Sequence, residues 1–202
     1  MEVVTAEEIA FRYSAGFDVI DGLSFSVGEG ALLRLSGPNG SGKTTLIKLL
    51  ARFHEPVGGS LDLPAAHEIG WMPDNPALLD HLTILEHFRF LSAVGVSFDE
   101  ERALERTGLS DSADLLCGAA SFGMRRRVSY AIATALPKRL LLLDEPFNGI
   151  DSGFVASMQS EIRLMLEDGA AVVVATHGAS TVEGVDHQEL ILGGGSGTGG
   201  EV

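Results

Sequence analysis

Residues 37–44 read Gly37-Pro38-Asn39-Gly40-Ser41-Gly42-Lys43-Thr44, and this stretch decides the fold. It fits the pattern G-x-x-x-x-G-K-[ST] of a phosphate-binding loop, with a strand expected before it and a helix after it. Glycines allow consecutive backbone N–H groups to curl around phosphate oxygens, and the N-terminus of the helix adds partial positive charge. Lys43 is expected to reach the β- and γ-phosphates, and Thr44 to place its hydroxyl on Mg²⁺. The stretch therefore predicts a nucleotide-binding α/β protein.

A second stretch supplies carboxylates. In Leu140-Leu141-Leu142-Leu143-Asp144-Glu145, an apolar strand delivers Asp144 to the carboxyl end of a sheet. An aspartate in that place can hold Mg²⁺ through water. Glu145 is then well placed to polarise a water for in-line attack on the γ-phosphate. The alternative for Glu145 is a solvated charge at a strand end.

Strands and helices alternate along most of the chain, which predicts an α/β fold with a mainly parallel sheet. The continuous apolar run of 140–143 is typical of a parallel strand that is covered on both faces. Thr83 and Glu86 form a capping-box pattern that opens a helix. Strands are predicted at 9–13, 23–27, 31–36, 60–63, 68–72, 140–143, 171–175 and 189–192, and helices at 43–53, 83–94, 99–107, 110–116, 122–136 and 152–166.

Composition limits the possible partners. With 14 basic and 28 acidic side chains in 202 residues, the formal net charge of −14 argues against a nucleic-acid partner. The single Cys117 cannot form an internal disulfide, and we expect it to be a small buried apolar residue. The sequence has neither an apolar run of about 18 residues nor a signal peptide. We therefore expect a cytoplasmic protein of one domain, soluble or peripheral on a membrane.

These two stretches, and the motifs described below, resemble the nucleotide-binding subunit of an ABC (ATP-binding cassette) transporter over nearly the whole chain. The resemblance implies a P-loop NTPase (RecA-like) core and an N-terminal antiparallel β subdomain, together formed by about 1–76 and 121–192. It also implies an inserted helical subdomain at 77–120. Residues 193–202 are rich in glycine and are predicted to form a flexible tail.

A signature motif is implied just before the predicted helix at 122–136. Ala120-Ser121-Phe122-Gly123-Met124 occupies the place of L-S-G-G-Q and keeps the serine and the second glycine. Ser121 and Gly123 would then cap the γ-phosphate held by a second subunit. The three arginines at 125–127 are interpreted as a solvated or salt-bridged helix face rather than a phosphate patch.

The resemblance implies further nucleotide contacts. Tyr13 stands where the family places an aromatic residue that stacks on adenine, the alternative being a tyrosine half-buried in a strand. His177 matches the family's switch histidine, which contacts the γ-phosphate. Asp151, in Asn148-Gly149-Ile150-Asp151, would couple the two active sites of a dimer. Thr45 completes the predicted nucleotide-binding set.

One position departs from the family. The run Gly70-Trp71-Met72-Pro73-Asp74 places Asp74 where the coupling loop normally carries a glutamine. An aspartate offers a full negative charge on a shorter arm. Asp74 is therefore either a Mg²⁺ ligand, directly or through water, or a loop residue that faces solvent.

The expected function is that of an ATPase subunit that closes head-to-tail around two Mg·ATP and drives integral membrane subunits. Its partner is a copy of itself or a second ATPase chain, it sits on the cytoplasmic face of the membrane, and the direction is export. The compact size resembles small exporter subunits, either the haem exporter of cytochrome c maturation or another small-molecule or peptide exporter. The alternative from another class is a nucleotide-binding regulator with slow or no turnover. Apolar residues of the insert either line a docking groove or form the insert's own core, namely Leu78, Leu79, Leu82, Phe88 and Phe90.

Overall fold

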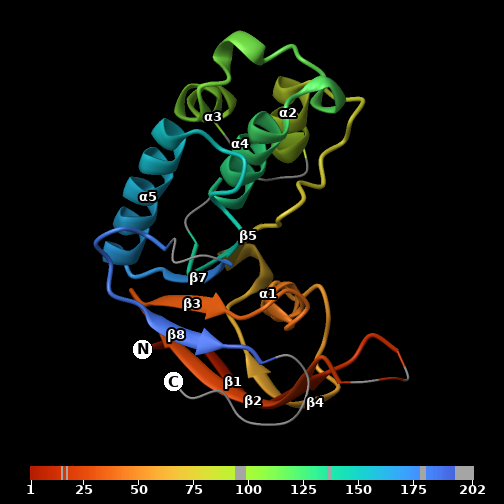
Figure 1. Cartoon of the computed structure of the whole chain (residues 1–202). Helices are drawn as coiled ribbons and strands as arrows, with labels where there is room; N and C mark the ends of the chain where they lie inside the picture. The colour runs from red at the N-terminus through yellow and green to blue at the C-terminus, as the bar shows by residue number, and fades with distance from the viewer. Residues whose placement is uncertain (15, 17, 94–98, 136–137, 178–180, 194–202) are drawn as a thin grey trace.

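A parallel sheet of five strands lies at the centre of the chain, in the order β5-β6-β7-β3-β8 (Figure 1). Its members are β3 (Leu32–Ser36), β5 (Ile69–Met72), β6 (Leu140–Asp144), β7 (Ala171–Ala175) and β8 (Gln188–Ile191). Every residue of β6 and β7 is buried, as predicted for parallel strands covered on both faces. The structure, a computed structural model, describes residues 1–14, 16, 18–93, 99–135, 138–177 and 181–193.

A separate antiparallel sheet carries the N-terminal part of the chain. It has three strands in the order β2-β1-β4, with bounds β1 (Glu2–Phe11), β2 (Ile20–Gly28) and β4 (Gly58–Asp62). The helix α1 (Lys43–Leu50) lies between the two sheets (Figure 1). Leu46, Ile47 and Leu50 pack there against residues of both sheets in one core. The α/β fold with a parallel sheet and an antiparallel β subdomain is therefore confirmed.

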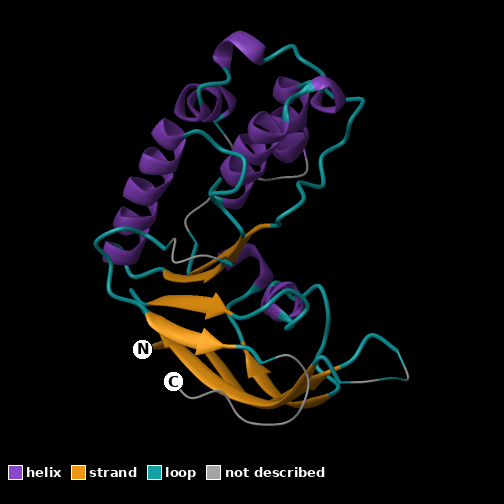
Figure 2. Ribbon diagram, viewed as in Figure 1, coloured by secondary structure: helices purple, strands orange, loops and turns teal. Residues whose placement is uncertain are grey.

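Helices cover the opposite face of the parallel sheet. The helices α4 (Phe122–Ala133) and α5 (Ser152–Glu167) lie on this side (Figure 2). Tyr130 of α4 and Phe154 and Ile162 of α5 belong to a second core with strand residues such as Val172. This layer brings the N-terminus of α4 close to the carboxyl ends of the strands.

The remaining helices form the end of the molecule farthest from the antiparallel sheet (Figure 2). They are α2 (Ile84–Ala93) and α3 (Glu100–Thr107), followed by the short 3₁₀ turns η2 (Ser110–Ser112) and η3 (Cys117–Ala119). A further 3₁₀ turn, η1 (Ala66–Glu68), precedes β5. The predicted capping box at Thr83 is present, since Glu86 N–H donates to Thr83 Oγ1 at 3.1 Å and Thr83 N–H to Glu86 Oε2 at 2.9 Å. Ile84, Phe88 and Leu104 pack with Val128 of α4 in a third core, which anchors this end to the rest.

Some sequence expectations are wrong in detail. The helix expected at 110–116 is limited to η2, because the following residues lead into an isolated bridge between Thr83 and Leu116. The strand expected at 9–13 ends at Phe11, and the helix expected at 122–136 ends at Ala133. Residues 94, 136 and 194–202, which include nearly all of the predicted flexible tail, lie outside the described residues.

The structure bears on two expectations from composition, one for the single cysteine and one for membrane-spanning helices. Cys117 is fully buried in the third core, as expected for a small apolar residue. Within the described ranges, none of the helices has the length and apolar character needed to cross a membrane. The division into core, helical insert and tail stays a prediction.

Candidate functional site

The phosphate loop follows β3 and leads directly into α1, as the pattern requires. Gly37 has a φ of 141°, and a Cβ there would overlap the carbonyl oxygen of Leu192, so this turn requires glycine. Lys43 is buried, and its Nζ donates to the carbonyl oxygens of Gly37 at 2.7 Å and Pro38 at 3.0 Å. The loop is thus wrapped around a fixed positive charge.

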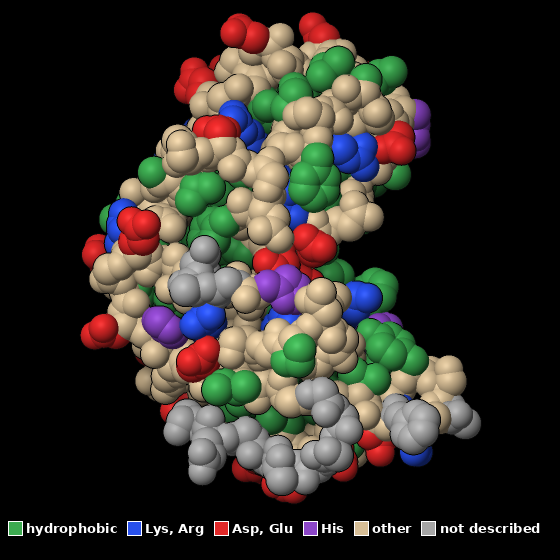
Figure 3. Space-filling model, in the orientation of Figure 1, with side chains coloured by type: hydrophobic (Ala, Val, Ile, Leu, Met, Phe, Trp, Pro, Cys, Tyr) green, Lys and Arg blue, Asp and Glu red, His purple; other side chains and the backbone are tan. Residues whose placement is uncertain are grey.

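An open cavity of about 420 Å³ lies beside this loop. Polar side chains reach it from the loop and from the ends of β5, β6 and β7, and Figure 3 shows acidic, basic and histidine side chains together on the hollowed side of the molecule. The lining residues are Tyr13, Val19, Asn39, Gly40, Gly42, Lys43, Thr44, Thr45, Asp74, Asp144, Glu145 and His177. Of the predicted phosphate-loop residues, Gly37, Pro38 and Ser41 do not line it, and the buried Ser41 hydroxyl has no hydrogen-bond partner in the described part of the chain.

Glu145 follows the last residue of β6 in an unusual backbone conformation. Its φ of 50° is in the left-handed region, which costs a non-glycine residue roughly 1–2 kcal/mol. Its N–H donates to Ala175 O at 2.8 Å, and its carbonyl oxygen accepts from Asn148 N–H at 3.2 Å. The backbone is therefore held from both sides, and the carboxylate is directed into the cavity rather than along the strand.

The two oxygens of the Glu145 carboxylate have different surroundings, because Oε2 accepts a hydrogen bond whereas the buried Oε1 lies close to His177 without a hydrogen bond in the described part of the chain. Its Oε1 lies 3.2 Å from His177 Nε2, and Asn148 Nδ2 donates to Oε2 at 3.2 Å. Burial raises the pKa of Glu145, and His177 opposes that rise. A carboxylate with a raised pKa is a stronger base than a solvated one, which suits it to accept a proton from water.

Oxygen ligands for Mg²⁺ are present at the end of β6 and the start of α1. Burial raises the pKa of Asp144, while a hydrogen bond from the Thr44 hydroxyl opposes the rise. The described residues hold no group of three or more His, Cys, Asp or Glu side chains arranged as a metal site. Mg²⁺ in proteins is held by one or two carboxylates together with phosphate oxygens, so this sparse oxygen set fits Mg²⁺ brought in with a nucleotide.

Tyr13 stands at the entrance to the cavity, outside β1. Its side chain is exposed, its hydroxyl lies 3.0 Å from Thr45 Oγ1, and its ring meets those of Phe11 and His54 edge-on. The alternative of a tyrosine half-buried in a strand is therefore wrong. Stacking on a base stays a prediction, and the exposed ring has the freedom to do so.

Asp74 lies in the wall of the same cavity, in the loop after β5. Its carboxylate is 3.3 Å from Arg126 Nη1 and its side chain is 56% exposed. Asp74 is thus an exposed loop residue, in line with the second alternative from the sequence, but the ion pair with Arg126 was not predicted. A direct role on Mg²⁺ stays a prediction.

The predicted signature residues form a second cavity of about 590 Å³, which shares no lining residue with the first. Ser121 caps α4, because its Oγ accepts from Met124 N–H at 3.2 Å. A Cβ on Gly123 would lie 2.8 Å from Gly149 O, so the two loops meet closely. Asp151 also lines this cavity, and its two oxygens accept from Phe154 N–H at 3.0 Å and from Arg127. Its pKa is lowered, first by that backbone hydrogen bond and then by Arg127.

The arginines of α4 differ from one another. Arg125 pairs with Asp80 at 2.6 Å and Arg127 pairs with Asp151, which confirms a salt-bridged face for these two. Arg126 is also salt-bridged, to Asp74, but its side chain is completely buried, so a solvated position is wrong for it. The helical period is the sequence signal for this burial, because Arg126 lies one turn before the buried Tyr130 on the same face of α4.

Comparison with known proteins identifies the family of this chain. Residues 20–148 match the ABC transporter family. The chain is 37% identical over 183 residues to the formylaminopyrimidine import ATP-binding protein ThiZ of Halalkalibacterium halodurans, covering 87% of this chain and 74% of that protein. It is 35% identical over 162 residues to the cytochrome c biogenesis ATP-binding export protein CcmA of Roseobacter denitrificans, covering 80% and 78%. It is 31% identical over 209 residues to the SkfA peptide export ATP-binding protein SkfE of Bacillus subtilis, covering 96% and 87%.

A solved structure agrees with these relatives. The ATP-binding subunit of an ABC transporter superposes with a TM-score of 0.84 at 27% identity, covering 94% of this chain and 85% of the other. The similarity therefore extends over both sheets and the helices, beyond the phosphate loop alone.

Proposed function

This chain belongs to the ABC transporter family of ATP-binding ATPases, and from that premise we propose that its phosphate-loop cavity binds Mg·ATP and that Glu145 activates the water that attacks the γ-phosphate. The observation that carries the proposal is the position of Glu145. Its carboxylate shares a cavity with Lys43, accepts a hydrogen bond from Asn148 and lies 3.2 Å from His177 Nε2. An oriented base with a raised pKa, opposite a phosphate-binding cation, is what in-line hydrolysis requires.

The other residues of the cavity have distinct roles in this proposal. Lys43 binds the β- and γ-phosphates by exchanging its contacts with loop carbonyls for phosphate oxygens. Thr44 and Asp144 hold Mg²⁺, which neutralises charge on the β- and γ-phosphates when bound. His177 orients Glu145 and donates to the γ-phosphate. Tyr13 stacks on the base, with its hydroxyl tied to Thr45.

A second ATPase chain completes the site. Ser121 and Gly123 belong to a cavity that shares no residue with the phosphate-loop cavity, so we assign them to the nucleotide of the partner chain. The Ser121-capped N-terminus of α4 offers a hydroxyl and backbone N–H groups, a combination suited to an anion. The partner is a second copy of this chain or a related ATPase, arranged head-to-tail.

A third cavity supports a membrane partner. It measures about 530 Å³, and among its lining residues are Phe53, Trp71 and Leu78 together with Asp74 and Asp144 of the phosphate cavity. Because this apolar groove shares residues with the ATP cavity, a protein bound in the groove can respond to whether nucleotide is present. We therefore place the docking site of an integral membrane subunit here, at the edge of the proposed helical subdomain of 77–120. Of the other apolar residues considered for this role, Phe88 is buried in the helical end, whereas Leu79 and Phe90 are exposed.

We propose transport in the export direction, which two of the three relatives described above support. CcmA of Roseobacter denitrificans and SkfE of Bacillus subtilis are both named as export proteins, for cytochrome c biogenesis and for a peptide. ThiZ of Halalkalibacterium halodurans is named as an import protein, so import is the alternative direction. The proposed place of the chain is the cytoplasmic face of the membrane, bound to the membrane subunits.

The test is ATP hydrolysis by the purified chain, measured with and without Mg²⁺ and with and without its membrane subunits. We expect Mg²⁺-dependent release of phosphate that rises with the membrane subunits present. Tight ATP binding with no turnover in either condition would identify a regulatory subunit instead. Uptake into inside-out vesicles that contain the complex, with haem and peptide cargo as the two arms, would separate the export substrates.

A further inference from the structure

Arg126 is the most buried charged side chain near the cavity, and none of its surface is exposed. Its guanidinium bridges separate segments of the chain. Nη1 donates to the carbonyl oxygen of Asp74 and lies 3.3 Å from the Asp74 carboxylate, while Nη2 donates to the carbonyl oxygens of Glu145 and, at 3.3 Å, Asp144. A planar guanidinium is the one side chain that presents donors in the fixed fork this arrangement needs.

Arg126 contacts the backbone of Glu145, and the proposed reaction depends on the conformation of that backbone. Glu145 is a non-glycine residue at a φ of 50°, and such strain persists only where the surroundings hold it. Ala175 O fixes the N–H of Glu145, and Arg126 fixes its carbonyl oxygen from the opposite side, together with Asn148 N–H. Arg126 therefore acts on the direction of the Glu145 side chain without touching the carboxylate.

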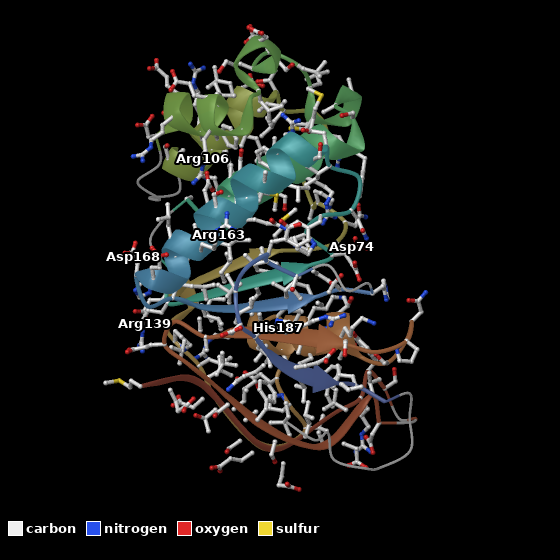
Figure 4. All side chains as sticks on the ribbon, turned by 60° about the vertical axis from the view of Figure 1, so that its left-hand side comes forward. Asp74, Arg106, Arg139, Arg163, Asp168 and His187 are labelled. Atoms are coloured by element: carbon white, nitrogen blue, oxygen red, sulfur yellow. The ribbon has the colours of Figure 1, made fainter. Side chains whose placement is uncertain are left out.

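The contact with Asp74 affects charge. Asp74, Asp144 and Glu145 bring three carboxylates into one cavity that is proposed to receive a polyanion. Lys43 lines that cavity, whereas Arg126 is completely buried and does not line it. Figure 4 shows Asp74 where the ends of the strands meet the helices, the position from which its carboxylate reaches both the cavity and α4. Paired with Arg126, Asp74 adds little net charge to the cavity.

We propose, on the basis of the function proposed above, that Arg126 is a positioning residue for ATP hydrolysis: it holds the backbone of Glu145 in its left-handed conformation and neutralises Asp74. The Asp74–Arg126 pair then stands in for the neutral amide that the family resemblance leads one to expect at position 74. An aspartate at this position is compatible with turnover because the arginine is behind it. The two residues are therefore interdependent, and each is expected to depend on the other in mutational tests.

The position of Arg126 defines a readout that a purely structural arginine would not move. Arg126 contacts the backbone of Glu145 and the carboxylate of Asp74, but it does not line the phosphate-loop cavity. Loss of Arg126 should therefore lower kcat and leave the affinity for Mg·ATP nearly unchanged, because Lys43 and the glycine loop still bind the phosphates.

The experiment measures kcat at saturating Mg·ATP and the affinity for ATP for the parent, Arg126→Gln, Asp74→Asn and the double variant. We expect Arg126→Gln to lower kcat by about tenfold or more, with ATP affinity changed less than about threefold. Adding Asp74→Asn should restore part of the lost kcat, because no unpaired carboxylate then remains at position 74. A parent-like kcat in Arg126→Gln, a loss of affinity as large as the loss of kcat, or a double variant no faster than Arg126→Gln overturns the proposal.

Two further variants cover folding and specificity. Arg126→Lys keeps the charge but cannot donate to three carbonyl groups and a carboxylate at once, so kcat should fall while the affinity for Mg·ATP stays close to that of the parent. A parent-like kcat for Arg126→Lys overturns the positioning role even if Arg126→Gln does not fold. The matched control is Arg125→Gln, the next residue on the same helix, paired with Asp80 instead. Failure of the proposed function is distinct, because it would appear as normal hydrolysis by Glu145→Gln.

Discussion

The cavity beside the phosphate loop and the cavity at the start of α4 lie on the same chain but hold their charges differently. In the first, Lys43 donates to the carbonyl oxygens of Gly37 and Pro38, and Asp144 and Glu145 line the cavity. In the second, the charges cancel within the chain, since Asp151 is bound by Arg127 and by the N-terminus of α5. We therefore expect the first cavity to bind and hydrolyse the nucleotide, and the second to bind an anion through N–H and hydroxyl groups.

This difference supports the proposal that a complete active site needs both cavities, one from each chain. The phosphate-loop cavity has the proposed base, the proposed metal ligands and a cation, but it is open. The signature cavity has the capping serine and the close Gly123–Gly149 contact, but its charged groups are already paired. Substitutions in the first should affect binding and chemistry in the single chain, and substitutions in the second should act only when two chains meet.

The largest expected effect is that of Glu145→Gln in the first cavity. The amide keeps the size of the side chain and its contact with Asn148 but cannot accept a proton, so kcat should fall about 100-fold or more while ATP still binds. Phosphate release and size-exclusion chromatography with Mg·ATP measure both properties, and we expect an ATP-bound dimer to accumulate. Glu167→Gln, the same change at the exposed end of α5, is the control. Hydrolysis at the parent rate would remove Glu145 from the mechanism.

Lys43→Ala should produce the next largest effect. Charge-assisted hydrogen bonds contribute about 1.5–3 kcal/mol, so loss of Lys43 should weaken ATP binding by about 10- to 100-fold. Equilibrium titration with a fluorescent ATP analogue measures the change. Lys138→Ala serves as the control, since Lys138 bonds to His67 O away from the cavity. Unchanged affinity for Lys43→Ala would mean that the glycine loop is not the phosphate site.

Gly123→Ala tests the second cavity. Its Cβ would lie 2.8 Å from Gly149 O, so the signature turn must shift away from the loop at 149. Because the phosphate-loop cavity is untouched, ATP binding to the single chain should be unchanged, while ATP-driven dimerisation and hydrolysis fall by about tenfold. Analytical ultracentrifugation with ATP reports the dimer. Gly193→Ala is the control, because a Cβ there meets nothing within 4 Å. Weaker ATP binding by the single chain would contradict the separation of the two cavities.

The smallest effect is expected for Tyr13. Tyr13→Ala removes the ring proposed to stack on the base and should weaken ATP binding by a few-fold, in line with about 0.5–1.5 kcal/mol for an aromatic pair. Tyr13→Phe keeps the ring and loses only the contact with Thr45, so its affinity should be close to that of the parent. Calorimetric titration with ATP and with inorganic triphosphate separates the base contribution, because triphosphate should bind both variants like the parent. Equal weakening for ATP and triphosphate would argue against base stacking.

Local patterns predicted the elements that surround the cavity. The apolar run at 140–143 and the glycine loop at 37–42 each have a strong local cause, namely burial on both faces and backbone conformations that favour glycine. The helix expected at 110–116 failed because its weak periodicity was overridden by pairing of Leu116 with Thr83 across the chain. Tyr13 was placed near the correct segment, but its exposure depends on where β1 ends.

The sequence by itself determined which chemical groups this protein has and the order in which strands present them. The phosphate-loop pattern, Asp144 and Glu145 at a strand end, and the caps Thr83, Asp99 and Ser121 follow from hydrogen bonds within a few residues along the chain. Only the tertiary structure decided the environment of Arg126 and Asp74, which are 52 residues apart in sequence. A pair of charges on a helix and a distant loop carries no local signature, because its formation depends on how α4 packs against the ends of β5 and β6.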